Sequence, residues 1–96
     1  MTLAEAKAFA ISENQEFEKY TSIIEEKVSR FFEAKTLFEL GTFIDEACNL
    51  RKEFHANGFV NGREDNILGG LIRDGIMDGC SRFEIDFDAF CEAGLI

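Results

Sequence analysis

The sequence has 96 residues, of which 46% are hydrophobic, and it contains 11 Phe, no Pro and a formal net charge of −9. This length fits one helical domain of residues 1–96 with a modest core, and the hydrophobic content is sufficient for folding. The negative charge argues against direct binding to nucleic acid, which needs clustered Lys and Arg, and against binding to anionic membrane surfaces.

The first half of the chain contains pairs of residues whose i,i+3 spacing is typical of helix starts. Thr2 and Glu5 have this spacing, so we predict a short helix over residues 2–11. Ser12 and Gln15 have it again, and apolar residues then recur at helical spacing as far as residue 34. We therefore predict an amphipathic second helix over residues 14–34.

A third pair, Thr36 and Glu39, precedes a helix that we predict over residues 37–55. Its apolar arc covers nearly half of its circumference, which indicates contact with more than one neighbour. Because the connection to the preceding helix is short, we expect the two helices to pack antiparallel. An Asn- and Gly-containing loop follows, and Asn61 or Asp65 is suited to cap the next helix.

Residues 67–80 have the periodicity of a helix with one apolar stripe, although the segment contains four glycines. A glycine in a helix interior costs about 1 kcal/mol relative to alanine. Gly75 and Gly79 are one turn apart and lie within the apolar stripe. We therefore predict that another backbone or a large ring packs closely against these two positions.

The last part of the chain alternates between apolar and acidic residues over positions 83–87, which is the period of a short strand. The predicted fold class is therefore mostly α: a small bundle of three main helices, a short N-terminal helix, and an irregular C-terminal segment with at most one short strand.

Two features favour self-association, most simply as a homodimer. A lone strand leaves backbone groups unpaired, and pairing with a second copy would satisfy them. In addition, Phe38, Phe59 and Val60 have no evident place in the core of one small chain. The alternative is that residues 81–88 run extended across the helices with water as the backbone partner.

Metal and catalytic patterns are weak. Residues 85–90 resemble the end of a calcium-binding EF-hand loop, but Ala89 stands where a bidentate Glu is required. The three cysteines and one histidine lack the paired spacing of a zinc site. A Cys–His nucleophile pair would require spatial proximity that spacing does not reveal. The sequence predicts no metal, no cofactor and no enzymatic activity.

The segment Gly62–Asp65 is the most site-like loop, because Arg63 stands beside two acids at a helix start. Acids at this position also suit the helix dipole, so a cap with a flanking charge is the more common explanation.

Small size, negative charge and the lack of a catalytic pattern favour a protein-binding module that docks on a basic partner protein. Inhibitors, immunity proteins and adaptors are of this kind, and a phage or mobile-element origin fits the size. The predicted partner-binding residues are the acids of the C-terminal segment, Glu84, Asp86, Asp88 and Glu92.

The alternative function is a homo-oligomer that binds a small ligand in a pocket between subunits, around Tyr20, Arg63 or Arg73. For either function we expect a cytoplasmic protein, because three cysteines without regular spacing suggest no disulfide framework. The absence of a signal peptide or a long apolar run supports the same location.

Overall fold

The computed structural model describes residues 2–82, and this part of the chain is helical apart from short connections. The elements in chain order are α1 (Leu3–Glu13), α2 (Phe17–Ser29), the 3₁₀ helix η1 (Arg30–Glu33), α3 (Leu37–Ala56) and α4 (Gly62–Arg82). The predicted mostly helical fold class is confirmed. The predicted strand at residues 83–87 lies outside the described residues.

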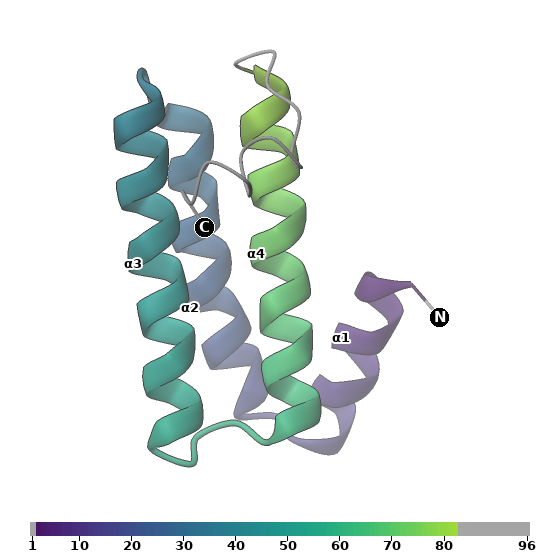
Figure 1. Ribbon diagram of the computed structural model, residues 1–96. Helices are drawn as coiled ribbons and strands as arrows, with labels where there is room; N and C mark the ends of the chain where they lie inside the picture. Colours follow the sequence, from purple (N-terminus) through teal and green to yellow (C-terminus); the bar gives the residue numbers. More distant parts are fainter. Residues whose placement is uncertain (1, 83–96) are drawn as a thin grey trace.

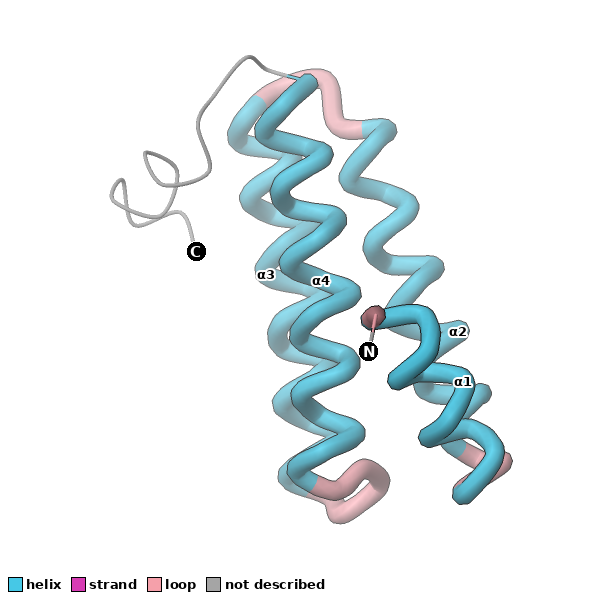
Figure 2. The backbone as a smooth tube through the Cα atoms, turned by 90° about the vertical axis from the view of Figure 1, so that its right-hand side faces the viewer, coloured by secondary structure: helices cyan, strands magenta, loops and turns pink. Residues whose placement is uncertain are grey.

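The three long helices α2, α3 and α4 stand side by side, and each runs antiparallel to the one before it (Figure 1). The expected antiparallel pairing of the second and third helices is therefore correct. We call the end of the bundle where α2 and α4 begin its base. α1 lies against the basal half of α4 and runs toward the base, where the chain turns back into α2 (Figures 1 and 2). α4 contacts all the other helices.

Two of the predicted capping pairs form the expected hydrogen bonds. Thr2 Oγ1 accepts from Glu5 N at 3.1 Å, and Thr36 Oγ1 accepts from Glu39 N at 3.1 Å. The Glu39 carboxylate also accepts from the backbone N–H of Lys35 at 3.0 Å. These contacts satisfy N–H groups that would have no partner within their own helices.

The predicted start of the second helix at Ser12 is wrong. α1 continues through Ser12, whose hydroxyl donates to the Phe9 carbonyl oxygen at 2.6 Å. The helix ends instead at Asn14, which is extended with φ −140° and ψ 97°. Asn14 Oδ1 accepts from Glu16 N at 3.2 Å, because a short amide side chain competes well for a backbone N–H at a turn.

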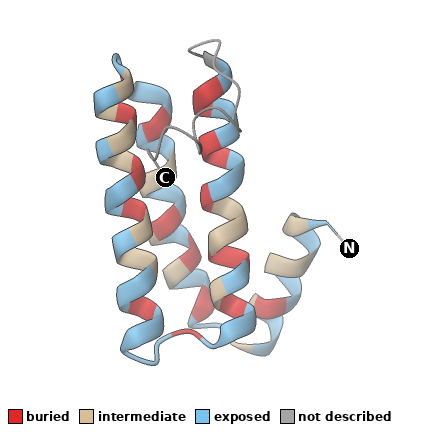
Figure 3. Cartoon of the chain, viewed as in Figure 1, coloured by how far each residue is buried: buried red, intermediate tan, exposed pale blue. Residues whose placement is uncertain are grey.

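The core lies between α2, α3 and α4, on the faces that these helices turn toward one another (Figure 3). Its largest fully buried apolar side chains are Phe17, Phe31, Ile24, Leu40, Ile44 and Leu68. Val60 is also buried, so the expectation that it has no place in the core is wrong: the α3–α4 loop folds it inward. Phe38 and Phe59 are exposed.

The two glycines singled out in the sequence are buried where α4 meets its neighbours. A Cβ atom at Gly75 would overlap Val28 Cγ1 and lie 3.0 Å from Phe31 Cδ2. A Cβ atom at Gly79 would lie 3.1 Å from Leu40 Cδ1. Gly75 thus makes room for α2 and η1, and Gly79 makes room for α3.

Two further glycines of α4, Gly69 and Gly70, also face neighbouring side chains. A Cβ at Gly70 would lie 2.9 Å from Leu3 Cδ1, on the side covered by α1. A Cβ at Gly69 would lie 2.7 Å from Arg51 Cζ, which belongs to α3. Gly69, Gly70, Gly75 and Gly79 therefore allow α1, α2 and α3 to pack closely on different sides of α4.

Candidate functional site

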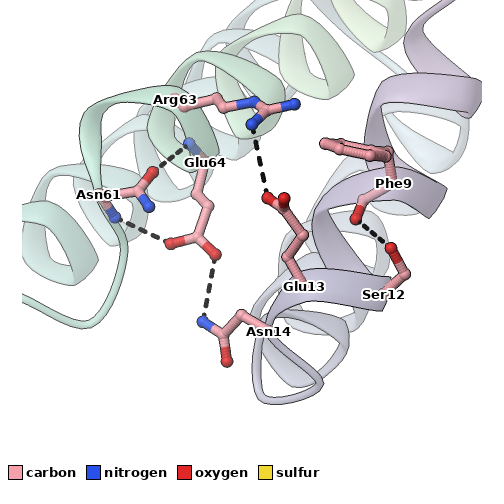
Figure 4. A network of polar contacts seen from close by, with 7 residues as sticks. All are labelled: Phe9, Ser12, Glu13, Asn14, Asn61, Arg63 and Glu64. Carbon is pink, nitrogen blue, oxygen red and sulfur yellow. Dashed lines mark hydrogen bonds and ion pairs between the residues drawn. The ribbon is translucent and has the colours of Figure 1, made fainter.

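The Gly62–Asp65 segment forms the first turn of α4, and its acids are held by the protein itself. Asn61 Oδ1 accepts from Glu64 N at 2.8 Å, and Glu64 Oε1 accepts from Asn61 N at 2.9 Å. Asn61, not Asp65, is therefore the capping residue. Glu64 is only 5% exposed, and its Oε2 accepts from Asn14 Nδ2 at 3.1 Å (Figure 4). This carboxylate connects the α1–α2 turn to the start of α4.

Arg63 projects from the same turn toward α1 (Figure 4). Its guanidinium carbon lies 4.8 Å from the centroid of the Phe9 ring, and its Nη1 lies 3.5 Å from Glu13 Oε2. Both members of the ion pair are more than half exposed, so the pair contributes little to stability. The candidate ligand residue Arg63 is thus engaged in contacts between α1 and α4.

Asp65 pairs with Arg51 of α3 by two parallel hydrogen bonds. Arg51 Nε lies 3.0 Å from Asp65 Oδ1, and Arg51 Nη2 lies 3.0 Å from Asp65 Oδ2. Two-pronged pairs of this kind hold both side chains in one geometry. The guanidinium lies over Gly69, where only the absence of a side chain leaves room for it.

An open hollow of about 530 Å³ lies beside this pair, along the flank of α3 that faces α4. We call it the α3–α4 hollow. Its lining mixes basic, acidic and apolar side chains: Ile44, Asp45, Cys48, Asn49, Arg51, Lys52, His55, Ala56 and Asp65. A volume of this size is within the range of small-ligand sites, which are usually more apolar.

Cys48 and His55, the residues of the weighed Cys–His pair, both line the α3–α4 hollow. Burial raises the pKa of the Cys48 thiol, Arg51 and Lys52 act in the opposite direction, and Asp45 adds to the increase. Because the thiolate is the nucleophilic form of cysteine, this shift lowers the fraction of Cys48 that is thiolate at a given pH.

The other candidate ligand residues have neighbours different from those of Arg63. The Tyr20 ring packs edge-on against Phe54, with centroids 4.9 Å apart, and stacks on Phe59 at 5.7 Å. Arg73 follows Arg63 by ten residues on α4, which is about 15 Å along a helix axis. Tyr20, Arg63 and Arg73 do not line the α3–α4 hollow.

A different surface stands out at the end of the bundle opposite the base, where η1 connects to α3. Phe38, on the first turn of α3, is 84% exposed, and Phe32 of η1 is 46% exposed. We call these two residues the aromatic corner. Nearby, Phe43 is covered by the Arg30 guanidinium at 4.9 Å, and Arg30 also pairs with Glu46. Single exposed apolar side chains are common on protein surfaces, and Phe38 is the most exposed of the large hydrophobic side chains in residues 2–82.

The acids predicted to bind a partner, Glu84, Asp86, Asp88 and Glu92, lie outside the described residues. Within residues 2–82 no three His, Cys, Asp or Glu side chains are grouped so as to hold a metal ion. In that same part of the chain, no helix combines the length and apolar character needed to cross a membrane.

Comparisons with known proteins give no match. No family model matches the chain, and neither the curated proteins nor the solved structures that were compared contain a similar chain.

Proposed function

We propose that this chain is a small acidic module that binds a basic partner protein, in the manner of an inhibitor, immunity protein or adaptor. The observation that carries the proposal is the 84% exposure of Phe38 on the first turn of α3. Burying a phenylalanine side chain removes it from water and contributes about 1.5–3 kcal/mol. A partner that covers Phe38 would gain this free energy.

Phe38 is not among the buried side chains that form the core of the described residues. The first turn of α3 is capped by Thr36, and Leu40 provides the buried contact with α4. Phe32, across the short connection, supplies a second partly exposed ring. Large aromatic anchors of this kind contribute most of the binding free energy in many interfaces.

Charge supports a basic partner. The whole chain has a net charge of −9, and the exposed residues next to the two rings in the chain include one acid, Glu33, and one base, Lys35. Glu84, Asp86, Asp88 and Glu92 remain the acids that the sequence assigns to the contact. Opposite charge accelerates association, and salt weakens it.

The proposal includes a cytoplasmic location and no catalytic activity. Cys48 is a free thiol, as is usual for proteins in a reducing compartment. The raised pKa of the Cys48 thiol agrees with a role other than nucleophile.

Three baits test the proposal by capture from native lysate and mass spectrometry: the wild type, Phe38→Ser and Phe59→Ser. Phe59 is a matched control, because it is half exposed but lies in the loop at the base. We expect one partner to bind the wild type and Phe59→Ser, to elute with salt, and to be lost from Phe38→Ser. Equal capture of that partner by Phe38→Ser, or binding that salt does not weaken, would refute the proposal.

A second candidate function is the binding of a small anionic ligand in the α3–α4 hollow, which has the size of a ligand site and contains the cationic side chains Arg51 and Lys52. This hollow lies within one chain and differs from the pocket between subunits, around Tyr20, Arg63 or Arg73, that the sequence suggested. Small anionic compounds should then raise the melting temperature of the protein, and Lys52→Ala should reduce that increase. If no anion in a broad panel changes the melting temperature, this alternative fails.

A further inference from the structure

α1 and α2 are separated by three residues, Asn14 to Glu16, of which Asn14 is extended. Asn14 has φ −140° and ψ 97°, whereas Glu16 already has helical angles of −64° and −25°. Between Leu3 and Ser29 the chain contains neither Gly nor Pro. If Asn14 became helical, these 27 residues would form one helix of about 40 Å.

The bend at Asn14 is maintained by one side chain. Its Oδ1 accepts from Glu16 N at 3.2 Å, and its Nδ2 donates to Glu64 Oε2 at 3.1 Å. The bond to Glu16 joins neutral groups and contributes modestly to stability, whereas the bond to the Glu64 carboxylate is charge-assisted and part-buried. Removal of the Asn14 side chain should therefore shift the balance from the bent form toward a straight one.

α1 is held on the bundle by both apolar and polar contacts. Ala10 is its one buried residue, Leu3, Ala6 and Ile11 are partly buried against the core, and Leu3 packs over Gly70. Lys7 pairs with Glu25, and Arg63 contacts both Phe9 and Glu13. Each of these contacts joins α1 to α2 or α4, so a second copy of the chain offers the same partners.

We propose that two copies of this chain exchange α1: in the exchanged dimer, residues 3–29 form one straight helix, and α1 of each copy docks on α2 and α4 of the other. The orientation permits this. α1 runs toward the base and α2 runs away from it, so a straightened α1 projects beyond the base of its own bundle (Figures 1 and 2).

A two-fold axis can place a second copy base to base with the first. The projecting α1 of the first copy then runs along the second bundle in the same direction as the α1 that it replaces. Closed two-fold pairs of this kind form easily by exchange of an identical element, because no new interface has to be evolved. The dimer does not depend on the proposed partner function. The aromatic corner is at the opposite end of each bundle, so the dimer presents two such corners.

Two variants at position 14 provide a matched test. Asn14→Ala and Asn14→Gly both remove the side-chain hydrogen bonds to Glu16 and Glu64. Alanine favours the helical conformation over glycine by about fivefold per residue, so two chains give about 25-fold. We expect the dimer association constant of Asn14→Ala to exceed that of Asn14→Gly by this factor, measured by sedimentation after refolding at high concentration.

A third variant, Gln15→Pro, should block the exchange. A proline at position 15 cannot continue the helix from Ile11, but it favours an extended residue before it, as Asn14 already is. We expect Gln15→Pro and the double variant Asn14→Ala/Gln15→Pro to remain monomeric. A dimer that persists in the double variant would overturn the proposal. So would a one-chain mass for Asn14→Ala at every concentration. If the proline variants do not fold, equal association constants for Asn14→Ala and Asn14→Gly would overturn it.

Discussion

At the scale of single residues, the space around each glycine determines whether that glycine stabilises or destabilises the protein relative to alanine. Gly75 faces Val28 and Phe31, and neither a β-branched side chain nor a buried ring moves aside easily. Gly41 on α3 has no atom within 4 Å of the position that a Cβ would take. The lost helix propensity is compensated by close packing at Gly75 and is not compensated at Gly41.

We predict opposite effects of alanine at these two positions. Gly75→Ala should overpack the α2–α4 contact and cost about 1–3 kcal/mol. Gly41→Ala should stabilise the protein by about 0.5–1 kcal/mol through helix propensity alone. Urea unfolding of the two variants beside the wild type measures both. If Gly75→Ala is stabilised as much as Gly41→Ala, the close contact at Gly75 is not real.

Cys48 gives a pH-dependent prediction. Burial raises the pKa of its thiol above the ordinary value of 9.0, with Arg51 and Lys52 opposing the shift. Because the folded-state pKa is the higher one, the contribution to stability is complete below the unfolded-state value and is lost as the pH rises through the folded-state value. Wild type should therefore lose stability relative to Cys48→Ala as the pH rises above 9.0. A difference between their free energies of unfolding that stays constant across this range would contradict the expected shift.

At the scale of helices, periodicity and capping pairs predicted most of the elements. Thr2, Thr36 and Asn61 begin helices as their side chains suggest. The false start at Ser12 has a local cause: Ser12 hydrogen-bonds within α1, and Asn14 makes the turn instead. The Ser12–Gln15 pair and Asn14 are both suited to begin a helix in this segment. Residue spacing alone does not decide which of them does so.

The contacts between helices were less predictable than the helices. Glu64 has the i,i+3 spacing to Asn61 that identifies a capping box, but its bond to Asn14 spans 50 residues. The Arg51–Asp65 pair joins two helices across a loop. Which side chains meet in this way depends on how the helices pack, and helical periodicity gives only the face on which each residue lies.

We predict that the two capping-box acids differ in their effect on stability. Glu64→Ala leaves the Asn61 N–H and the Asn14 amide without their acceptor at a buried site, which should cost about 1–3 kcal/mol. Glu39→Ala is the matched control, because Glu39 accepts from a backbone N–H at an exposed helix start. Its loss should cost roughly 0.5–1 kcal/mol, since water can replace the carboxylate. If thermal or urea unfolding shows the same loss of stability in both variants, the burial of Glu64 does not increase its contribution to stability.

At the scale of the whole molecule, the described bundle has its core between the long helices and exposed aromatic side chains at one end. Core side chains come from all three long helices, and α4 fits between the others because its glycines leave space. Phe38 and Phe32 remain exposed at the end of the bundle opposite the loop that carries Phe59. The sequence suggested that Phe38 and Phe59 lie outside the core, but not that they occupy opposite ends.

The central claim is that Phe38 serves a partner and not the fold, and urea unfolding of Phe38→Ser tests it most directly. We expect the free energy of unfolding of this variant to stay within about 0.5 kcal/mol of the wild type, because surface substitutions have small effects. A loss of about 2 kcal/mol or more, typical of a buried aromatic side chain, would contradict the claim. It would show that the Phe38 ring is packed within the folded protein and is not available to a partner.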